Sequence, residues 1–280
     1  MAKETPMIFD DSAAYERFMG RWSRAVAPVF VDWLSSPRRA SWLDVGCGTG
    51  ILAETVLEFC TPSAMSAVDP APTQVAAAAR MHAAGLATFQ VADARKLPFA
   101  DASFDVVASA LVVNFIPDRP LAMAEMVRVA RAGGAVAAYV WDFAEELSPS
   151  GPLRRAMRRF GAEVPAIPGT DASRLESLRE LFRAGGLEQI ETRTIEVCLA
   201  YADFRDFWTA QTPGYAPTTK IIDGMKESDR TRLMRAVQAS LPAGPHGSIE
   251  YFARANAVKA RVPRSRSGHL SSPCPAAEIA

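Results

Sequence analysis

WLDVGCGTG, residues 42–50, is the stretch that decides the fold. An apolar run with the character of a β-strand leads into three alternating glycines, and a helical pattern follows over residues 49–59. Glycine adopts positive φ and lets a ligand approach the backbone closely, and the first turn of a helix presents unpaired N–H groups. The segment therefore predicts a strand, a loop that holds a small molecule, and a helix.

Short β-rich runs alternate with helical patterns after this loop. Strands are predicted at residues 41–45, 64–69, 88–92, 104–113 and 135–141, and helices at 49–59, 72–84 and 118–130. Two further alternating runs, 187–201 and 247–259, complete the sheet, and the last strand is expected to be antiparallel. Strands that alternate with helices indicate an α/β fold. We therefore predict a Rossmann-like sheet of seven strands, mostly parallel, with helices on both faces.

Other segments lie outside the alternating unit. Within residues 1–40, apolar positions three or four apart predict helices ahead of a main domain at 41–261. Residues 202–245 carry helical stretches and aromatic residues between the last two strands, too long for a hairpin turn, and are predicted to form a cap over the rim of the sheet. Residues 262–280 contain few large apolar groups, so we expect a disordered tail.

Composition excludes several classes of protein. The 280 residues include 31 Lys and Arg against 31 Asp and Glu, so the basic surplus of a nucleic-acid partner is missing. The most apolar stretch, 106–116, is shorter than the roughly 20 residues of a membrane span. The N-terminus lacks an apolar core behind a basic start, so we expect no secretory signal and a cytoplasmic location. The sequence leaves the oligomeric state open.

Cysteine and histidine spacing indicates no metal centre and no disulfide framework, because no CxxC pair is present. The residues concerned are Cys47, Cys60, Cys198, Cys274, His82, His246 and His269.

A dinucleotide-binding fold is the main competing interpretation. Gly48, Gly50 and Ala53 satisfy its relaxed fingerprint, and Asp69 follows Gly50 by 19 residues, as a ribose-binding acid does. Asp44, two positions before the first glycine, disfavours it, since a carboxylate faces a pyrophosphate unfavourably and suits a cationic ligand. A nicotinamide-dependent reductase also lacks a visible Tyr-x-x-x-Lys pair. A non-catalytic binding protein on the same scaffold is the third interpretation.

Four segments carry a resemblance to a known family. They are LDVGCGTG at 43–50, SAVDPAP at 66–72, VADARKLPFADASFDVV at 91–107 and VRVARAGGAVAAYVW at 127–141. The chain resembles the class I S-adenosylmethionine-dependent methyltransferases over roughly residues 15–259, in particular the small-molecule group similar to ubiquinone and menaquinone biosynthesis methyltransferases. Ala132 stands where that family usually has proline, which affects a turn and not the cofactor segments.

The resemblance implies S-adenosylmethionine as cofactor. The glycine loop would wrap the methionine part of the cofactor, and Asp69 would bind the ribose hydroxyls. Asp93 and Ala94 would contact the adenine, and an N-terminal lid would close over the cofactor. The ligand's ammonium and diol suit three acids at successive strand ends, 25 and 24 residues apart. The expected cofactor residues are Tyr15, Arg21, Trp22, Asp44, Gly46, Cys47, Gly48, Gly50, Asp69, Pro70, Asp93 and Ala94.

The implied reaction is an in-line methyl displacement onto a small-molecule acceptor at oxygen, nitrogen or carbon. Positioning and water exclusion suffice for such a step, so no protein nucleophile is expected, and His246 is the only candidate base. The rim of the sheet and the cap offer an aromatic lining that suits an apolar or aromatic acceptor. The expected acceptor residues are Asn114, Phe115, Trp141, Trp208 and Tyr215.

Overall fold

The computed structural model describes residues 14, 16–81, 85 and 87–264. A seven-stranded sheet has the order β3-β2-β1-β4-β5-β7-β6, with β7 antiparallel to both neighbours and the other pairs parallel. This confirms the predicted Rossmann-like sheet. The strands are β1 (Ser41–Val45), β2 (Ala64–Asp69), β3 (Thr88–Val91), β4 (Phe104–Ala110), β5 (Ala130–Trp141), β6 (Glu188–Tyr201) and β7 (Ile249–Arg261).

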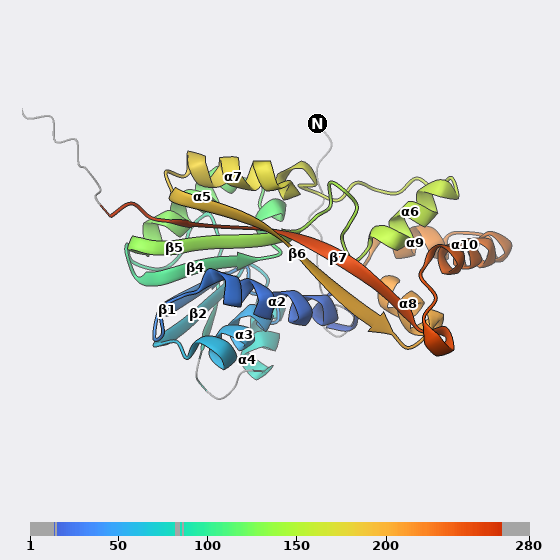
Figure 1. Cartoon of the computed structure of the whole chain (residues 1–280), viewed down its shortest axis with the longest axis horizontal. Helices are drawn as coiled ribbons and strands as arrows, with labels where there is room; N and C mark the ends of the chain where they lie inside the picture. Colours follow the sequence, from blue (N-terminus) through green and yellow to red (C-terminus); the bar gives the residue numbers. More distant parts are fainter. Residues whose placement is uncertain (1–13, 15, 82–84, 86, 265–280) are drawn as a thin grey trace, which may run out of the picture.

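Helices cover both faces of the sheet (Figure 1). Buried side chains of α2 and α3 belong to the core on one face, and those of α5 and α7 to the core on the other. The helices are α2 (Arg21–Leu34), α3 (Ile51–Cys60), α4 (Pro72–Met81), α5 (Arg119–Val129), α6 (Gly151–Arg159), α7 (Leu175–Ala184), α8 (Phe204–Gln211), α9 (Pro217–Asp223) and α10 (Glu227–Ser240), with short turns η1 (Glu16–Gly20), η2 (Val113–Phe115), η3 (Asp171–Ser173) and η4 (Pro245–Gly247).

The inner strand β5 shows why the sheet needs both helical layers. Successive side chains of a strand point to opposite faces. Ala137, Tyr139 and Trp141 accordingly join the first core, whereas Val136 and Val140 join the second. All five are buried. A strand that is apolar on both faces is stable only inside a three-layer fold.

The two ends of the described chain are more firmly packed than the sequence suggested. Trp22, Val26 and Phe30 of α2 are fully buried, so this helix is part of the core. At the other end, Val262 is 2% exposed and exchanges backbone hydrogen bonds with Gly133 and Gly134. The packed chain thus includes Val262, the first residue of the predicted tail, while residues 265–280 lie outside the described residues.

A two-stranded ribbon carries the cap. β5 ends at Trp141, which pairs with Ala255, and the earlier residues of β7 pair with β6 alone. The ribbon therefore extends beyond the end of β5, and α8, α9 and α10 connect its two strands near the carboxyl ends of the parallel strands (Figure 1). α10 packs against α6, and the role of residues 202–245 as a cap stays a prediction.

Candidate active site at the carboxyl edge of the sheet

The glycine loop joins β1 to α3 with a backbone that only glycine adopts readily. Gly46, Gly48 and Gly50 have φ of 84°, 52° and 90°. A Cβ on Gly46 would lie 2.6 Å from a methyl group of Val112, so the loop also packs too closely for any side chain there. The N–H groups of Gly46 and Cys47 donate to the carbonyl of Val68 at 2.8 and 2.9 Å, which fixes the loop to the end of β2.

Asp44 is the most unusual residue of the site. Its side chain is 1% exposed, and neither carboxylate oxygen has a hydrogen-bond partner among the described residues. Burial, and then the negative charge of Asp69, raise the pKa of Asp44 from 3.8 to about 8. A buried carboxylate without a partner is costly. The position therefore favours a ligand that brings a cation or a hydrogen-bond donor.

Asp69 follows directly at the end of β2 and braces the loop. Its two carboxylate oxygens accept from the N–H of Gly48 at 3.0 Å and the N–H of Ala71 at 2.9 Å. Burial raises the pKa of Asp69 despite these two bonds, which lower it. Each oxygen keeps a lone pair, so the side chain can accept from two hydroxyl groups. Pro70, beside it, is exposed.

Asp93 follows β3 and is bound differently. It accepts from the N–H of Arg95 at 2.8 Å and pairs with the Arg95 guanidinium at 2.6 Å. Hydrogen bonds from Arg95 lower the pKa of Asp93, and the neighbouring Ala94 is buried. Because β3, β2 and β1 are adjacent parallel strands, the three acids line one edge of the sheet, in the crevice where open α/β sheets bind ligands.

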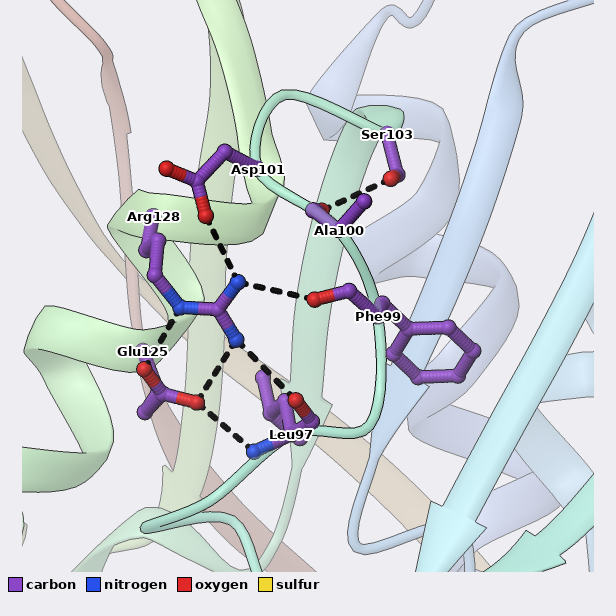
Figure 2. Close-up of polar contacts among 7 residues, drawn as sticks. All are labelled: Leu97, Phe99, Ala100, Asp101, Ser103, Glu125 and Arg128. Atoms are coloured by element: carbon purple, nitrogen blue, oxygen red, sulfur yellow. Dashed lines mark hydrogen bonds and ion pairs between the residues drawn. The ribbon is translucent and has the colours of Figure 1, made fainter.

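The loop after Ala94 is held by Arg128 of α5 (Figure 2). This guanidinium donates to the carbonyls of Leu97 at 3.0 Å and Phe99 at 2.8 Å, to Asp101 at 2.8 Å, and to both oxygens of Glu125 at 2.7 and 2.8 Å. Glu125 in turn accepts from the N–H of Leu97 at 2.7 Å. All five N–H donors of an arginine are thus satisfied. Sequence reasoning missed this contact, because a lone arginine on a helix gives no signal.

The predicted acceptor residues after β4 and β5 include further unpaired polar atoms. Asn114 in η2 is 1% exposed, and neither its amide nitrogen nor its amide oxygen has a partner among the described residues. The indole N–H of Trp141, 2% exposed, is also without a partner there. The rings of Phe115 and Phe143 pack with centroids 5.9 Å apart. The strand ends of β4 and β5 thus combine aromatic surface with two unsatisfied hydrogen-bonding groups.

The cap residues and the candidate base lie further out. Trp208 on α8 is half-buried against Phe204, with ring centroids 5.8 Å apart, and Tyr215 between α8 and α9 is half-buried. His246 is exposed in η4, at a left-handed φ of 58°, at the outer end of the ribbon. The end of β5 pairs with Ala255, well along β7 from this histidine. We therefore assign it no part in proton transfer.

The N-terminal residues form two attachments. Trp22 donates to the hydroxyl of Tyr201 at 3.0 Å within the core, so packing explains it fully. Arg21 donates to Asp206 at 3.2 Å and to the carbonyl of Ala200 at 2.8 Å, which ties α2 to the base of the cap. Tyr15 lies outside the described residues.

Glu16 provides a contact to the glycine loop that the sequence did not reveal. One of its oxygens accepts from the Thr49 hydroxyl at 2.6 Å, and the other pairs with Arg24 at 3.0 Å. It holds η1 against the start of α3.

Cys47 in the loop is buried, and burial raises the pKa of its thiol, so it stays protonated. Among the described residues, no group of three or more His, Cys, Asp or Glu side chains is placed to hold a metal ion. Over the same part of the chain, the helices are too short or too polar to cross a membrane.

Comparisons with known proteins agree with this geometry. A family described as a methyltransferase domain matches residues 43–138. An uncharacterized methyltransferase of Mycobacterium marinum is 37% identical over 133 residues, 45% of this chain and 51% of that protein. The demethylmenaquinone methyltransferase of Roseiflexus is 29% identical over 171 residues, 55% of this chain and 70% of that protein. The chain spans about half the length of the first of these relatives.

A solved structure shows the same fold. Haemonchus contortus phosphoethanolamine N-methyltransferase 2, in complex with S-adenosyl-L-methionine, matches with a TM-score of 0.54 and 17% identity, covering 91% of this chain and 59% of that one. The sheet order, the glycine loop and the acids at the strand ends define a Rossmann-like fold of the methyltransferase type. Together with the family match over residues 43–138, they show a methyltransferase domain in this chain that is similar to the class I S-adenosylmethionine-dependent methyltransferases.

Proposed function

We propose that the chain binds S-adenosylmethionine above the glycine loop and transfers its methyl group to a neutral small molecule of apolar or aromatic character. The observation that carries this proposal is the buried Asp44 carboxylate without a partner among the described residues. An ammonium group at this position would satisfy the carboxylate and favour its ionised form. An anionic pyrophosphate there would be repelled, which argues against a nicotinamide cofactor.

The residues present fit the methyltransferase cofactor in order. Gly48 has open space beside it for its methionine part, Asp69 has lone pairs for a ribose diol, and Asp93 with Ala94 borders the place for an adenine. When bound, S-adenosylmethionine supplies a methyl group already activated on a sulfonium. The protein's contribution is therefore to hold the two reactants in line and to exclude water.

The acceptor is proposed to lie against η2 and the end of β5. Asn114 offers one amide donor pair and one carbonyl acceptor, and Trp141 one N–H donor, all in buried positions. A hydroxyl or carbonyl group of the acceptor would satisfy these atoms, while its apolar part would contact Phe115. The Asn114 amide and the Trp141 indole are both neutral hydrogen-bonding groups, so the acceptor is expected to be uncharged where it meets them.

We further propose that acceptor choice depends on the cap at residues 202–245. Trp208 and Tyr215 give the cap a half-buried aromatic surface, and Arg21 connects the cap to the N-terminal helix. Function on such folds is set by what is attached at the strand ends. The N-terminal residues 1–40 would then complete the cofactor side, and residues 265–280 would be dispensable.

Isothermal titration calorimetry tests the cofactor assignment. We expect binding of S-adenosylmethionine and S-adenosylhomocysteine and none of NADH. Asp69→Ala should weaken both by about 1–3 kcal/mol, the scale of lost hydrogen bonds to a charged acceptor. Asp171→Ala is the matched control, since that acidic side chain is 97% exposed on η3. Clear NADH binding without binding of either methionine ligand would overturn the proposal.

A further inference from the structure

A second cavity lies between α6, the end of α10 and the outer part of β7. Its volume is about 310 Å³, and none of its lining residues belongs to the glycine loop or to the strand ends that carry the three acids. The residues that matter here are Arg155 and Arg159 from α6, Leu241 and Pro242 after α10, and Tyr251 and Phe252 from β7. The cavity is thus separate from the proposed cofactor crevice.

The positive charge on one wall is not neutralised. Arg155 and Arg159 stand four residues apart, on the same face of α6. Among the described residues, the Arg155 side chain donates only to the backbone carbonyl of Glu146, and the Arg159 side chain makes no hydrogen bond or ion pair. The Glu146 carboxylate is engaged by Arg158, and the lining includes no acid.

The neighbouring face of α6 adds to the surplus of positive charge. The Arg154 guanidinium donates a hydrogen bond to the carbonyl of Pro165. Burial, and then the nearby charge of Arg158, lower the pKa of Arg154 to about 10. Like charges at this spacing on a helix destabilise it. Arg155 and Arg159 have the same spacing, so an anion bound between them in the cavity would relieve their repulsion.

The opposite wall is apolar. Leu241 and Pro242 close one side. Tyr251 contributes only its ring, because its hydroxyl donates to Pro149 and accepts from Gln211, both at 2.8 Å. Ligand sites are mostly apolar with a few convergent polar groups, and this cavity has that composition.

We propose that this cavity binds a small organic anion, with its carboxylate on Arg155 and Arg159 and its apolar body on Leu241 and Pro242. The planar guanidinium matches a carboxylate in a bidentate manner. The volume suits a molecule of one ring and a short chain. This site does not depend on the proposed methyl transfer. Its occupant differs from the cofactor in charge, because it carries only a carboxylate, whereas S-adenosylmethionine also carries an ammonium and a sulfonium.

Calorimetry with the full chain tests the proposal, with 4-phenylbutyrate, 4-phenylbutylamine and inorganic phosphate as probes. We expect phenylbutyrate to bind about tenfold more tightly than the amine, because only the acid forms charge-assisted hydrogen bonds with arginine. Phosphate, which lacks the apolar body, should also bind more weakly than phenylbutyrate. Arg159→Gln and Leu241→Ala should each lower phenylbutyrate affinity about fivefold or more.

Arg183→Gln, an exposed arginine in the last turn of α7, is the matched control and should leave phenylbutyrate binding unchanged. Titration of S-adenosylmethionine into the same variants should give the wild-type affinity, which shows that they are folded and separates this proposal from the proposed function. Equal affinity for the acid and the amine, no binding of phenylbutyrate, or full binding by Arg159→Gln would each overturn the proposal.

Discussion

Asp44 should make the ligand-free protein less stable as the pH rises. In the folded chain its pKa is raised to about 8 from an ordinary 3.8. Between these values the folded state keeps a proton that the unfolded state loses, so the free energy of unfolding falls with pH by about 1.4 kcal/mol per unit. Across the whole interval the loss is on the order of 5 kcal/mol, comparable to the total stability of many domains.

Asp44→Asn removes this titration while keeping the size of the side chain. We expect the variant to have a flatter stability profile from pH 5 to pH 8, and to exceed the wild type most at pH 8. Urea unfolding of both proteins at each pH measures the difference. The pKa of Asp69 is also raised, so the free energy of unfolding of the variant still falls with pH, but less steeply. Asp93 and Asp105 have lowered pKa values, so their titration changes the free energy of unfolding only below about pH 4. Parallel profiles of wild type and variant would refute the reasoning.

Four further predictions concern the site. Binding of S-adenosylmethionine at pH 7 should release up to about one proton, because a cation favours ionised Asp44; titrations in two buffers of different ionisation enthalpy measure it, and Asp44→Asn should release none. Asn114→Leu should raise the free energy of unfolding by about 1–3 kcal/mol by removing unsatisfied buried groups, while abolishing methyl transfer; a loss of stability in urea unfolding would mean that the amide is already paired. Arg128→Lys should weaken cofactor binding and cost about 2 kcal/mol of stability, because lysine replaces five donors with three; Arg131→Lys, which changes an ion pair between β5 and Asp105 of β4, serves as the comparison in calorimetry and unfolding. Trp208→Ala should raise the KM for an acceptor found by screening metabolites with labelled S-adenosylmethionine, at unchanged cofactor affinity; unchanged kinetics would exclude the cap from the acceptor pocket.

Local sequence determined much of the sheet. Periodicity placed the strands at 41–45 and 64–69 with the bounds that the structure has. The strand predicted at 104–113 ends earlier, at Ala110, because Leu111 takes a left-handed φ of 63° and the chain turns into η2. The strand predicted at 135–141 begins earlier, at Ala130, which pairs with Phe104 across an irregular register. Such departures depend on neighbouring strands, which a local pattern does not contain.

The site was predictable where a motif carries it and not where tertiary packing does. The glycines and the three acids follow from strand ends that a sequence shows. By contrast, an aromatic residue on an amphipathic helix suits a lid as well as a core, and only the contact with Tyr201 assigns Trp22 to the core. The unpaired state of Asn114 also depends on everything around it, so no spacing rule could have revealed it.

The ribbon of β6 and β7 gives the chain a position at which the segment between these two strands can be exchanged for another. Tyr201 and Ile249, where the cap leaves and re-enters the sheet, are paired neighbours on adjacent strands. A segment whose two ends lie side by side can be replaced by another of different length without moving the strands that flank it. Chimeras cut at these two residues would therefore transplant a whole cap between proteins of this architecture in a single step.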